Sequence, residues 1–119
     1  MVRLFEDFQQ VLMIKNMVAY FNMPLEIVSC PIIREDDGLA MSSRNIHLST
    51  SDRKNALVLS QSLQFVKDNY EKLSIVDLLA NAKQMIEKAS GVALDYFTIA
   101  HGDSLLPVEN KKGQNIVAL

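Results

Sequence analysis

Three segments of the chain repeat apolar residues at the spacing of one helix face. The first segment follows Asp7, and the other two follow Ser49 and Ser74. These three residues can cap a helix, and three positions on each has a residue that can pair with the cap, namely Gln10, Asp52 and Asp77. The faces predicted for these three helices are Ile14, Met17, Val18 and Phe21; Ala56, Leu59, Leu63 and Val66; and Leu78, Ala82, Met85, Ile86 and Ala89.

Shorter apolar runs predict strands. Leu25–Cys30 is rich in aliphatic residues, Val92–Ala100 combines β-branched and aromatic residues, and Asn115–Leu119 is a third candidate. Asn22 and Pro24 are expected to end the helix that precedes the first of these strands.

The order of elements is therefore helix, strand, long loop, helix, helix, strand, strand. A helix followed by an aliphatic strand normally belongs to a larger parallel sheet, whereas the later elements predict strands covered by two helices. We therefore expect an α+β fold in which residues 31–119 form a small antiparallel sheet packed with helices. Residues 1–30 are expected to be the last helix–strand unit of a separate domain with a Rossmann-like sheet.

The composition of the 119 residues is that of an ordinary globular protein, with 49% hydrophobic and 22% charged residues. A net charge of −2 argues against binding nucleic acid or a membrane surface through bulk charge. The sequence has no signal-peptide pattern and no apolar run of membrane-spanning length. A single cysteine, Cys30, excludes a disulfide within the chain, suits a cytoplasmic location, and is expected to be buried.

Candidate chemistry lies in the polar segment Pro31–Leu48, because a loop of this length in a compact domain is usually functional. Ser42, Ser43 and Arg44 place two hydroxyls and a guanidinium side by side. Such groups bind phosphate oxygens and offset the charge that develops in phosphoryl or nucleotidyl transfer. From residue types alone, a capped surface loop remains the commoner interpretation of this cluster.

The stretches Ile32–Glu35 and Asp37–Asn45, followed by Leu48-Ser49, resemble the signature of the pantothenate synthetase family. Asp7–Gln10 and Asp95-Tyr96 fit that family in order and spacing. The Met-Ser-Ser-Arg segment is similar to the phosphate loop of class I aminoacyl-tRNA synthetases.

The resemblance implies the C-terminal portion of an AMP-forming, ATP-binding ligase of the nucleotidyltransferase superfamily, active in pantothenate and coenzyme A biosynthesis. Such an enzyme joins pantoate to β-alanine with ATP through a pantoyl adenylate, releasing AMP and pyrophosphate. On this view residues 1–30 come from the nucleotide-binding domain, and residues 31–119 form a lid on the ATP side.

The resemblance also implies roles for individual residues. Catalysis would proceed by positioning and charge neutralisation, without a protein nucleophile. Mg²⁺ would accompany ATP, with its ligands outside this chain, and the full-length protein is compatible with a homodimer. The roles are pantoate binding by Gln10; catalysis and phosphate binding by Ser42, Ser43 and Arg44; the adenine pocket for Ile33 and Met41; and the ribose side for Asp7.

Several features depart from the family pattern. Glu6 precedes Asp7, where the family has a Gly-x-Lys segment, and the His-x-Gly-His motif is missing. His101 does not belong to such a motif, and His47 and His101 are expected in turns or on the surface. We therefore expect the chain to be inactive alone. A non-catalytic binding module with the same fold is the alternative, and a different nucleotidyltransferase is a third interpretation.

Overall fold

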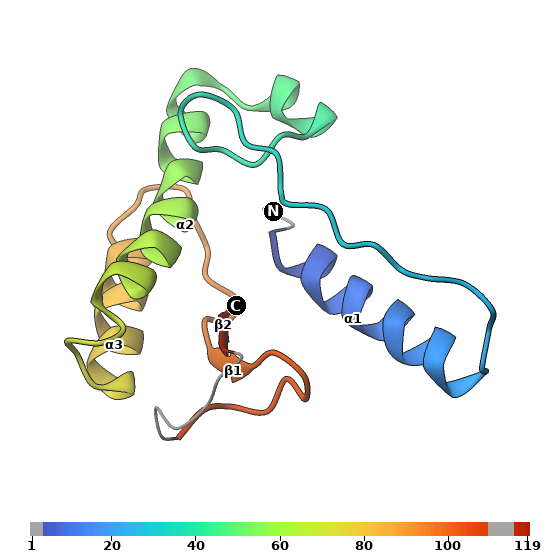
Figure 1. Ribbon diagram of the computed structural model, residues 1–119. Helices are drawn as coiled ribbons and strands as arrows, with labels where there is room; N and C mark the ends of the chain where they lie inside the picture. The colour runs from blue at the N-terminus through green and yellow to red at the C-terminus, as the bar shows by residue number, and fades with distance from the viewer. Residues whose placement is uncertain (1–3, 110–115) are drawn as a thin grey trace.

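The computed structural model describes the backbone of residues 4–109 and 116–119, and side chains from residue 8 onward within these ranges. Helices dominate, and the two short strands pair with each other (Figure 1). The elements in order are α1 (Leu4–Tyr20), the 3₁₀ helix η1 (Ser43–His47), α2 (Thr50–Asn69), α3 (Ile75–Glu87), β1 (Ile99–His101) and β2 (Ile116–Ala118).

Serine caps begin both α2 and α3, as predicted from the sequence. Ser49 Oγ accepts a hydrogen bond from the Asp52 backbone N–H at 3.1 Å and donates to the Asp52 carboxylate at 2.7 Å. Ser74 and Asp77 repeat this arrangement at 3.1 and 2.6 Å. Each cap satisfies a backbone N–H that the helix itself leaves without a partner.

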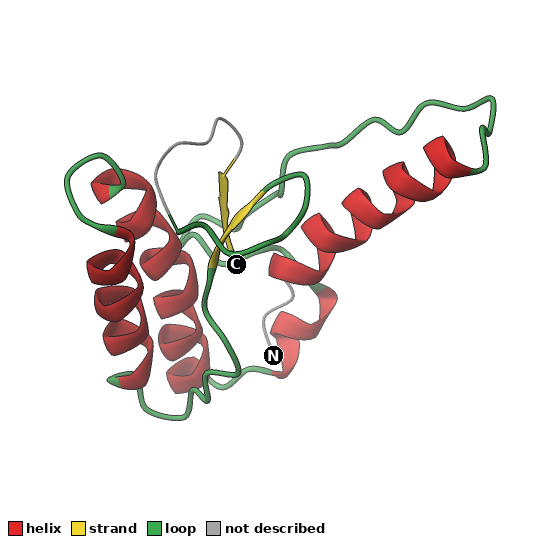
Figure 2. Ribbon diagram, turned by 90° about the horizontal axis from the view of Figure 1, so that it is seen from below, coloured by secondary structure: helices red, strands yellow, loops and turns green. Residues whose placement is uncertain are grey.

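The core lies between the α2–α3 pair and the small sheet. The two helices run side by side, and the sheet packs beside them (Figure 2). Leu78, Ala82 and Ile86 of α3 are fully buried, and Val66 of α2 is 4% exposed. The faces predicted for these two helices are therefore the ones that build the core.

The sheet is antiparallel, as expected, but much shorter than the sequence predicts. β1 pairs with β2 in the register Ile99 with Ala118, and mutual hydrogen bonds between Thr98 and Leu119 extend the ladder by one pair. The prediction of a strand from Val92 is wrong, because residues 92–97 have no regular secondary structure. This stretch carries the chain from α3 to the sheet, and the buried Phe97 contributes to the core without strand pairing.

Helix α1 ends as predicted but begins earlier than the capping pattern indicates. Asp7 lies within α1, which already includes Leu4, so Asp7 is not the cap. At the other end, Asn22 has a φ of 48°, and the Met23 N–H donates to the Val18 carbonyl at 3.0 Å. This backbone geometry closes the last turn of the helix.

The predicted strand Leu25–Cys30 is not a strand in this structure. Residues 25–33 run back alongside α1 as irregular chain (Figures 1 and 2). A strand requires a neighbouring strand for its hydrogen bonds, and none of the described residues supplies one here. Cys30, expected to be buried, is exposed for the same reason.

The face predicted for α1 does not build the core. Ile14, Met17 and Phe21 are 43%, 44% and 63% exposed. Another side of α1 contributes Phe8 to a cavity of about 310 Å³ that Cys30 also lines. Unlike α2 and α3, α1 therefore leaves its main apolar stripe open to solvent.

Candidate functional site

A tight backbone hairpin presents the candidate phosphate-binding residues. Arg34 and Ala40 form an isolated antiparallel bridge, and Glu35 N–H donates to the Leu39 carbonyl at 2.8 Å. Gly38 turns the chain with a φ of 91°, a conformation that residues with a β-carbon rarely adopt. Leu39 is 3% exposed and anchors the hairpin by burial.

The hairpin brings together the two residues assigned to an adenine pocket. Met41 N–H donates to the Ile33 carbonyl at 3.0 Å, so the two residues flank the open end of the hairpin. Their side chains are 61% and 68% exposed, respectively. Two large apolar side chains are therefore exposed at this end of the hairpin, where the flat face of a base could pack.

Ser42, Ser43 and Arg44 follow Met41 directly, and all three are exposed. Ser42 caps the 3₁₀ helix η1, since its Oγ accepts from the Arg44 backbone N–H at 3.3 Å. Within the part of the chain that the structure describes, the Arg44 guanidinium has neither a hydrogen bond nor an ion pair. Its donors are therefore available to a ligand.

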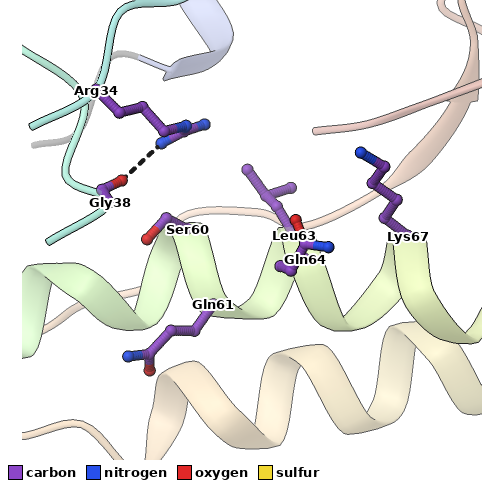
Figure 3. A pocket seen from close by; sticks show the side chains of 7 residues that line it. All are labelled: Arg34, Gly38, Ser60, Gln61, Leu63, Gln64 and Lys67. Atoms are coloured by element: carbon purple, nitrogen blue, oxygen red, sulfur yellow. Dashed lines mark hydrogen bonds between the residues drawn. The ribbon is translucent and has the colours of Figure 1, made fainter. Parts of the chain in front are cut away.

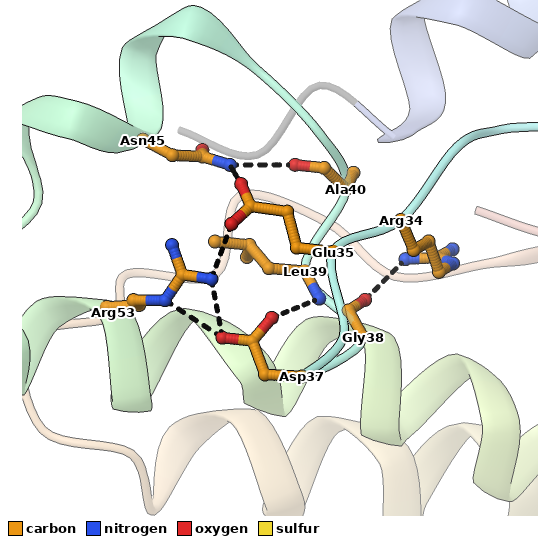
Figure 4. Close-up of polar contacts among 8 residues, drawn as sticks. All are labelled: Arg34, Glu35, Asp37, Gly38, Leu39, Ala40, Asn45 and Arg53. Carbon is orange, nitrogen blue, oxygen red and sulfur yellow. Dashed lines mark hydrogen bonds and ion pairs between the residues drawn. The ribbon is translucent and has the colours of Figure 1, made fainter.

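A polar network behind the hairpin joins it to α2 (Figure 4). Arg53 Nη2 lies 2.7 Å from Glu35 Oε2 and 2.6 Å from Asp37 Oδ2, and its Nε donates to Asp37 at 2.8 Å. Asn45 Nδ2 donates to the other oxygen of Glu35 at 2.6 Å. We call these four residues, Arg53, Glu35, Asp37 and Asn45, the Arg53 network.

The contacts of the Arg53 network favour ionised carboxylates. Hydrogen bonds from Asn45 and then Arg53 lower the pKa of Glu35 below its ordinary value of 4.5. The backbone N–H of Leu39 and the guanidinium of Arg53 lower the pKa of Asp37 below 3.8. Both side chains therefore carry charge near neutral pH and hold Arg53 between them.

Sequence reasoning gave the Arg53 network no role, although three of its members lie within the quoted signature. Arg53 is 16 and 18 residues from its two acidic partners. No helical or strand spacing joins positions so far apart, so only the folded hairpin reveals the pairing. The one available signal was a pair of acidic residues in a hairpin followed by a basic residue in the first turn of a helix.

Of the remaining predicted site residues, the structure describes the side chain of Gln10 but not that of Asp7. Gln10 is exposed on α1, and no contact among the described residues joins it to Ser42–Arg44. The side chain of Asp7 lies outside the described residues. His47 is exposed at the end of η1, as expected, but His101 is half-buried within β1 rather than in a turn.

A family model described as pantoate-beta-alanine ligase matches residues 5–119 of the chain. The chain belongs to the pantoate–β-alanine ligase family. It is similar to a pantothenate synthetase from Geotalea daltonii, with 44% identity over 116 residues, and to one from Acetivibrio thermocellus, with 42% identity over 117 residues. The alignments cover 96% of this chain but only 41% of either relative, so the chain spans about two fifths of their length.

The fold agrees with that of a ligase of this family. A crystal structure of pantothenate synthetase from Thermus thermophilus superimposes with a TM-score of 0.83 at 31% sequence identity. The superposition covers 95% of this chain and 46% of that protein. The arrangement of helices and small antiparallel sheet is therefore the one this family uses.

A groove of about 480 Å³ is lined by the hairpin and by α2 (Figure 3). Two basic side chains line it: Arg34, whose Nη1 donates to the Gly38 carbonyl at 3.0 Å, and Lys67 of α2. Ser60 and Gln64 add polar atoms. The groove could accept an anionic group, but none of Ser42, Ser43 and Arg44 lines it.

Metal-binding clusters and membrane-spanning helices are both absent from the described part of the chain. Among residues 4–109 and 116–119, no three His, Cys, Asp or Glu side chains gather closely enough to hold a metal ion. None of the helices in these ranges is both long and apolar enough to cross a membrane.

Proposed function

We propose that this chain is the ATP-side part of a pantoate–β-alanine ligase that forms pantothenate through a pantoyl adenylate. One observation supports this most directly. In a chain that belongs to the family, Ser42, Ser43 and Arg44 are exposed and adjacent, and they follow a hairpin that the burial of Leu39 and the ion pairs of Arg53 hold in place. The Arg44 guanidinium, which has no partner among the described residues, leaves its donors free for phosphate oxygens.

In the first step, a carboxylate oxygen of pantoate attacks the α-phosphorus of ATP, and pyrophosphate leaves. Negative charge spreads over the phosphate oxygens, where Ser42 and Ser43 hydroxyls and the Arg44 guanidinium would donate hydrogen bonds. In the second step, the amine of β-alanine attacks the acyl carbon, loses a proton, and AMP leaves. The chain would contribute orientation and charge compensation to both steps.

The other assignments complete the proposal. Ile33 and Met41 would contact adenine, Gln10 would orient pantoate, and Asp7 would lie on the ribose side. Residues 1–30 would belong to a Rossmann-like nucleotidyltransferase domain and residues 31–119 to a lid over ATP. Mg²⁺ bound to ATP would take its protein ligands from outside this chain, and the complete protein would be cytoplasmic and compatible with a homodimer.

A binding module without catalysis is the second candidate, and Glu6 favours it. Glu6 stands where the family pattern has lysine, so one expected cation beside ATP is missing from this sequence. A module of this kind would bind nucleotide without turnover. Measuring both ATP binding and pyrophosphate release therefore separates the two candidates.

Arg44→Ala tests the role of the exposed guanidinium. The chain is fused to the part of the Geotalea daltonii enzyme that it does not match, and pantoate-dependent release of pyrophosphate from ATP is measured. We expect the variant to slow adenylation by about tenfold to several hundredfold, because a charge-assisted contact that strengthens in the transition state is lost. The melting temperature should change little, since Arg44 is exposed.

Lys54→Ala is the matched control. Lys54 is an exposed cation on α2, so its removal changes the net charge equally without touching the hairpin. An unchanged adenylation rate in Arg44→Ala, with a large fall in melting temperature, would make Arg44 structural. A fusion that binds ATP but releases no pyrophosphate would favour the binding module.

A further inference from the structure

The segment that carries Ser42–Arg44 has little apolar packing to hold it. All residues from 31 to 48 are described, and among them only Leu39 is buried. A chain segment loses conformational entropy when it is ordered, and here hydrophobic burial offsets little of that loss. Polar contacts must therefore fix the position of this segment.

Arg53 supplies the principal link between the segment and α2. Its guanidinium contacts Glu35 at 2.7 Å and Asp37 at 2.6 Å, so one rigid group holds two points of the hairpin (Figure 4). A planar fork of donors fixes both the distance and the angle of its partners, which a lysine ammonium cannot do. The α2 helix thereby sets the orientation of the hairpin.

The contacts continue from Arg53 to the phosphate-binding residues. Glu35 Oε1 accepts a hydrogen bond from Asn45 Nδ2 at 2.6 Å, while Glu35 Oε2 contacts Arg53. Asn45 Nδ2 also donates to the Ala40 carbonyl at 2.9 Å, and the Asn45 backbone N–H donates to the Ser42 carbonyl at 3.0 Å. An unbroken series of contacts thus joins Arg53 to η1, where Arg44 resides.

Arg53 also controls the charge beside this cluster. Glu35 and Asp37 lie in the same segment as Ser42–Arg44, and both are ionised near neutral pH, as carboxyl groups ordinarily are. Their contacts lower the two pKa values further. Two carboxylates without a compensating cation would repel a polyphosphate. The Arg53 guanidinium offsets this charge, and the two carboxylates engage its Nε and Nη2 donors.

We infer that Arg53 is a positioning residue for ATP, acting through Glu35 and Asn45 on Ser42–Arg44 without touching the nucleotide. The inference rests on the proposed function. Loss of Arg53 would leave the phosphate donors in the chain but displaced from their working positions. Small displacements of positioning groups are known to cost large factors in rate.

The kinetic test uses the fusion with the Geotalea daltonii enzyme and three variants. Arg53→Ala should lower kcat/KM for ATP by about tenfold to a hundredfold, while KM for pantoate stays unchanged. Arg53→Lys should recover part of this loss, because it restores the charge but not the fork. Lys54→Ala, which removes the adjacent cation, should behave like the parent protein.

A double variant separates charge from geometry. Asp37→Asn introduced into Arg53→Ala removes one uncompensated carboxylate and should raise kcat/KM for ATP above that of Arg53→Ala. If charge compensation were the whole effect, Arg53→Lys would match the parent, and positioning would be excluded. A lower melting temperature with unchanged kcat/KM for ATP would also overturn the inference.

A second measurement on the 119-residue chain does not depend on activity. In ¹H–¹⁵N spectra, Arg53→Ala should shift the amide resonances of Ser43, Arg44 and Asn45 while those of Leu78 and Ile86 stay in place. Unmoved resonances for residues 43–45 would overturn the inference even if the fusion makes adenylate. A fusion without adenylation would count against the proposed function alone, since these resonances would still report on positioning.

Discussion

At the scale of single residues, the candidate site depends on a few side chains and one backbone conformation. Gly38 adopts a φ of 91°, and a β-carbon built there would lie 3.6 Å from Ser60 Oγ, an ordinary contact. Backbone conformation rather than space therefore requires glycine at this position. Beside it, the carboxylates of Glu35 and Asp37 join the hairpin to Arg53.

The two carboxylates predict how stability depends on pH. Their folded-state pKa values lie below 4.5 and 3.8, so protons bind the unfolded chain more readily. The stability that the two ionised carboxylates contribute to the folded chain is complete at neutral pH. It is lost as the pH falls through their lowered folded-state pKa values. In urea unfolding of the chain, the stability advantage of the parent over Glu35→Gln should shrink as the pH falls below 4.5, the ordinary pKa of Glu35. An advantage that stays constant below this pH would contradict the ionic role of Glu35.

At the scale of elements, α2 and α3 form a unit with its own local signals. Each begins at a serine cap, and the α3 face of Leu78, Ala82 and Ile86 is completely buried. The α1 helix has a comparable apolar stripe but does not bury it. Periodicity predicted all three helices equally well, whereas packing distinguishes them.

The cap of α3 provides the prediction at this scale. Ser74→Ala removes the oxygen that accepts from Asp77 N–H at 3.1 Å. We expect the free energy of unfolding to fall by about 1 kcal/mol, measured by urea denaturation. Ser90→Ala is the control, because Ser90 is not buried and caps no helix. Equal stabilities for the two variants would show that the cap contributes nothing measurable.

At the scale of the whole molecule, the chain is less compact than its length suggests. Its radius of gyration is 15.8 Å, against about 13.5 Å for a compact domain of this length. The α1 helix and residues 25–33 project from the α2–α3 core (Figure 1). The chain also spans only 41% of the relatives it matches.

These facts predict the activity of the chain alone. We expect the purified 119 residues to form no pantothenate from pantoate, ATP and β-alanine, because phosphate donors are needed on more than one side of the developing charge. The measurement is AMP release with and without each substrate, with the full Geotalea daltonii enzyme as the positive control. AMP release that requires both pantoate and β-alanine would refute this prediction.

Features that depend on near neighbours could be predicted from the order of residues along the chain. Ser49 and Ser74 cap residues three positions away, and the buried faces of α2 and α3 repeat every three or four residues, so both are visible in a linear pattern. The family was equally visible, because Asp37–Asn45 is a continuous stretch. The adjacency of Ser42, Ser43 and Arg44 needed no fold at all.

Features that depend on distant partners became visible only in the folded chain. Leu25–Cys30 has the composition of a strand, but strand formation requires hydrogen bonds from another strand that the described chain does not offer. Whether α1 buries its stripe likewise depends on what lies against it. Arg53 meets Glu35 across 18 residues because the hairpin folds back onto α2. Pairings of this kind follow from chain geometry, and no local spacing encodes them.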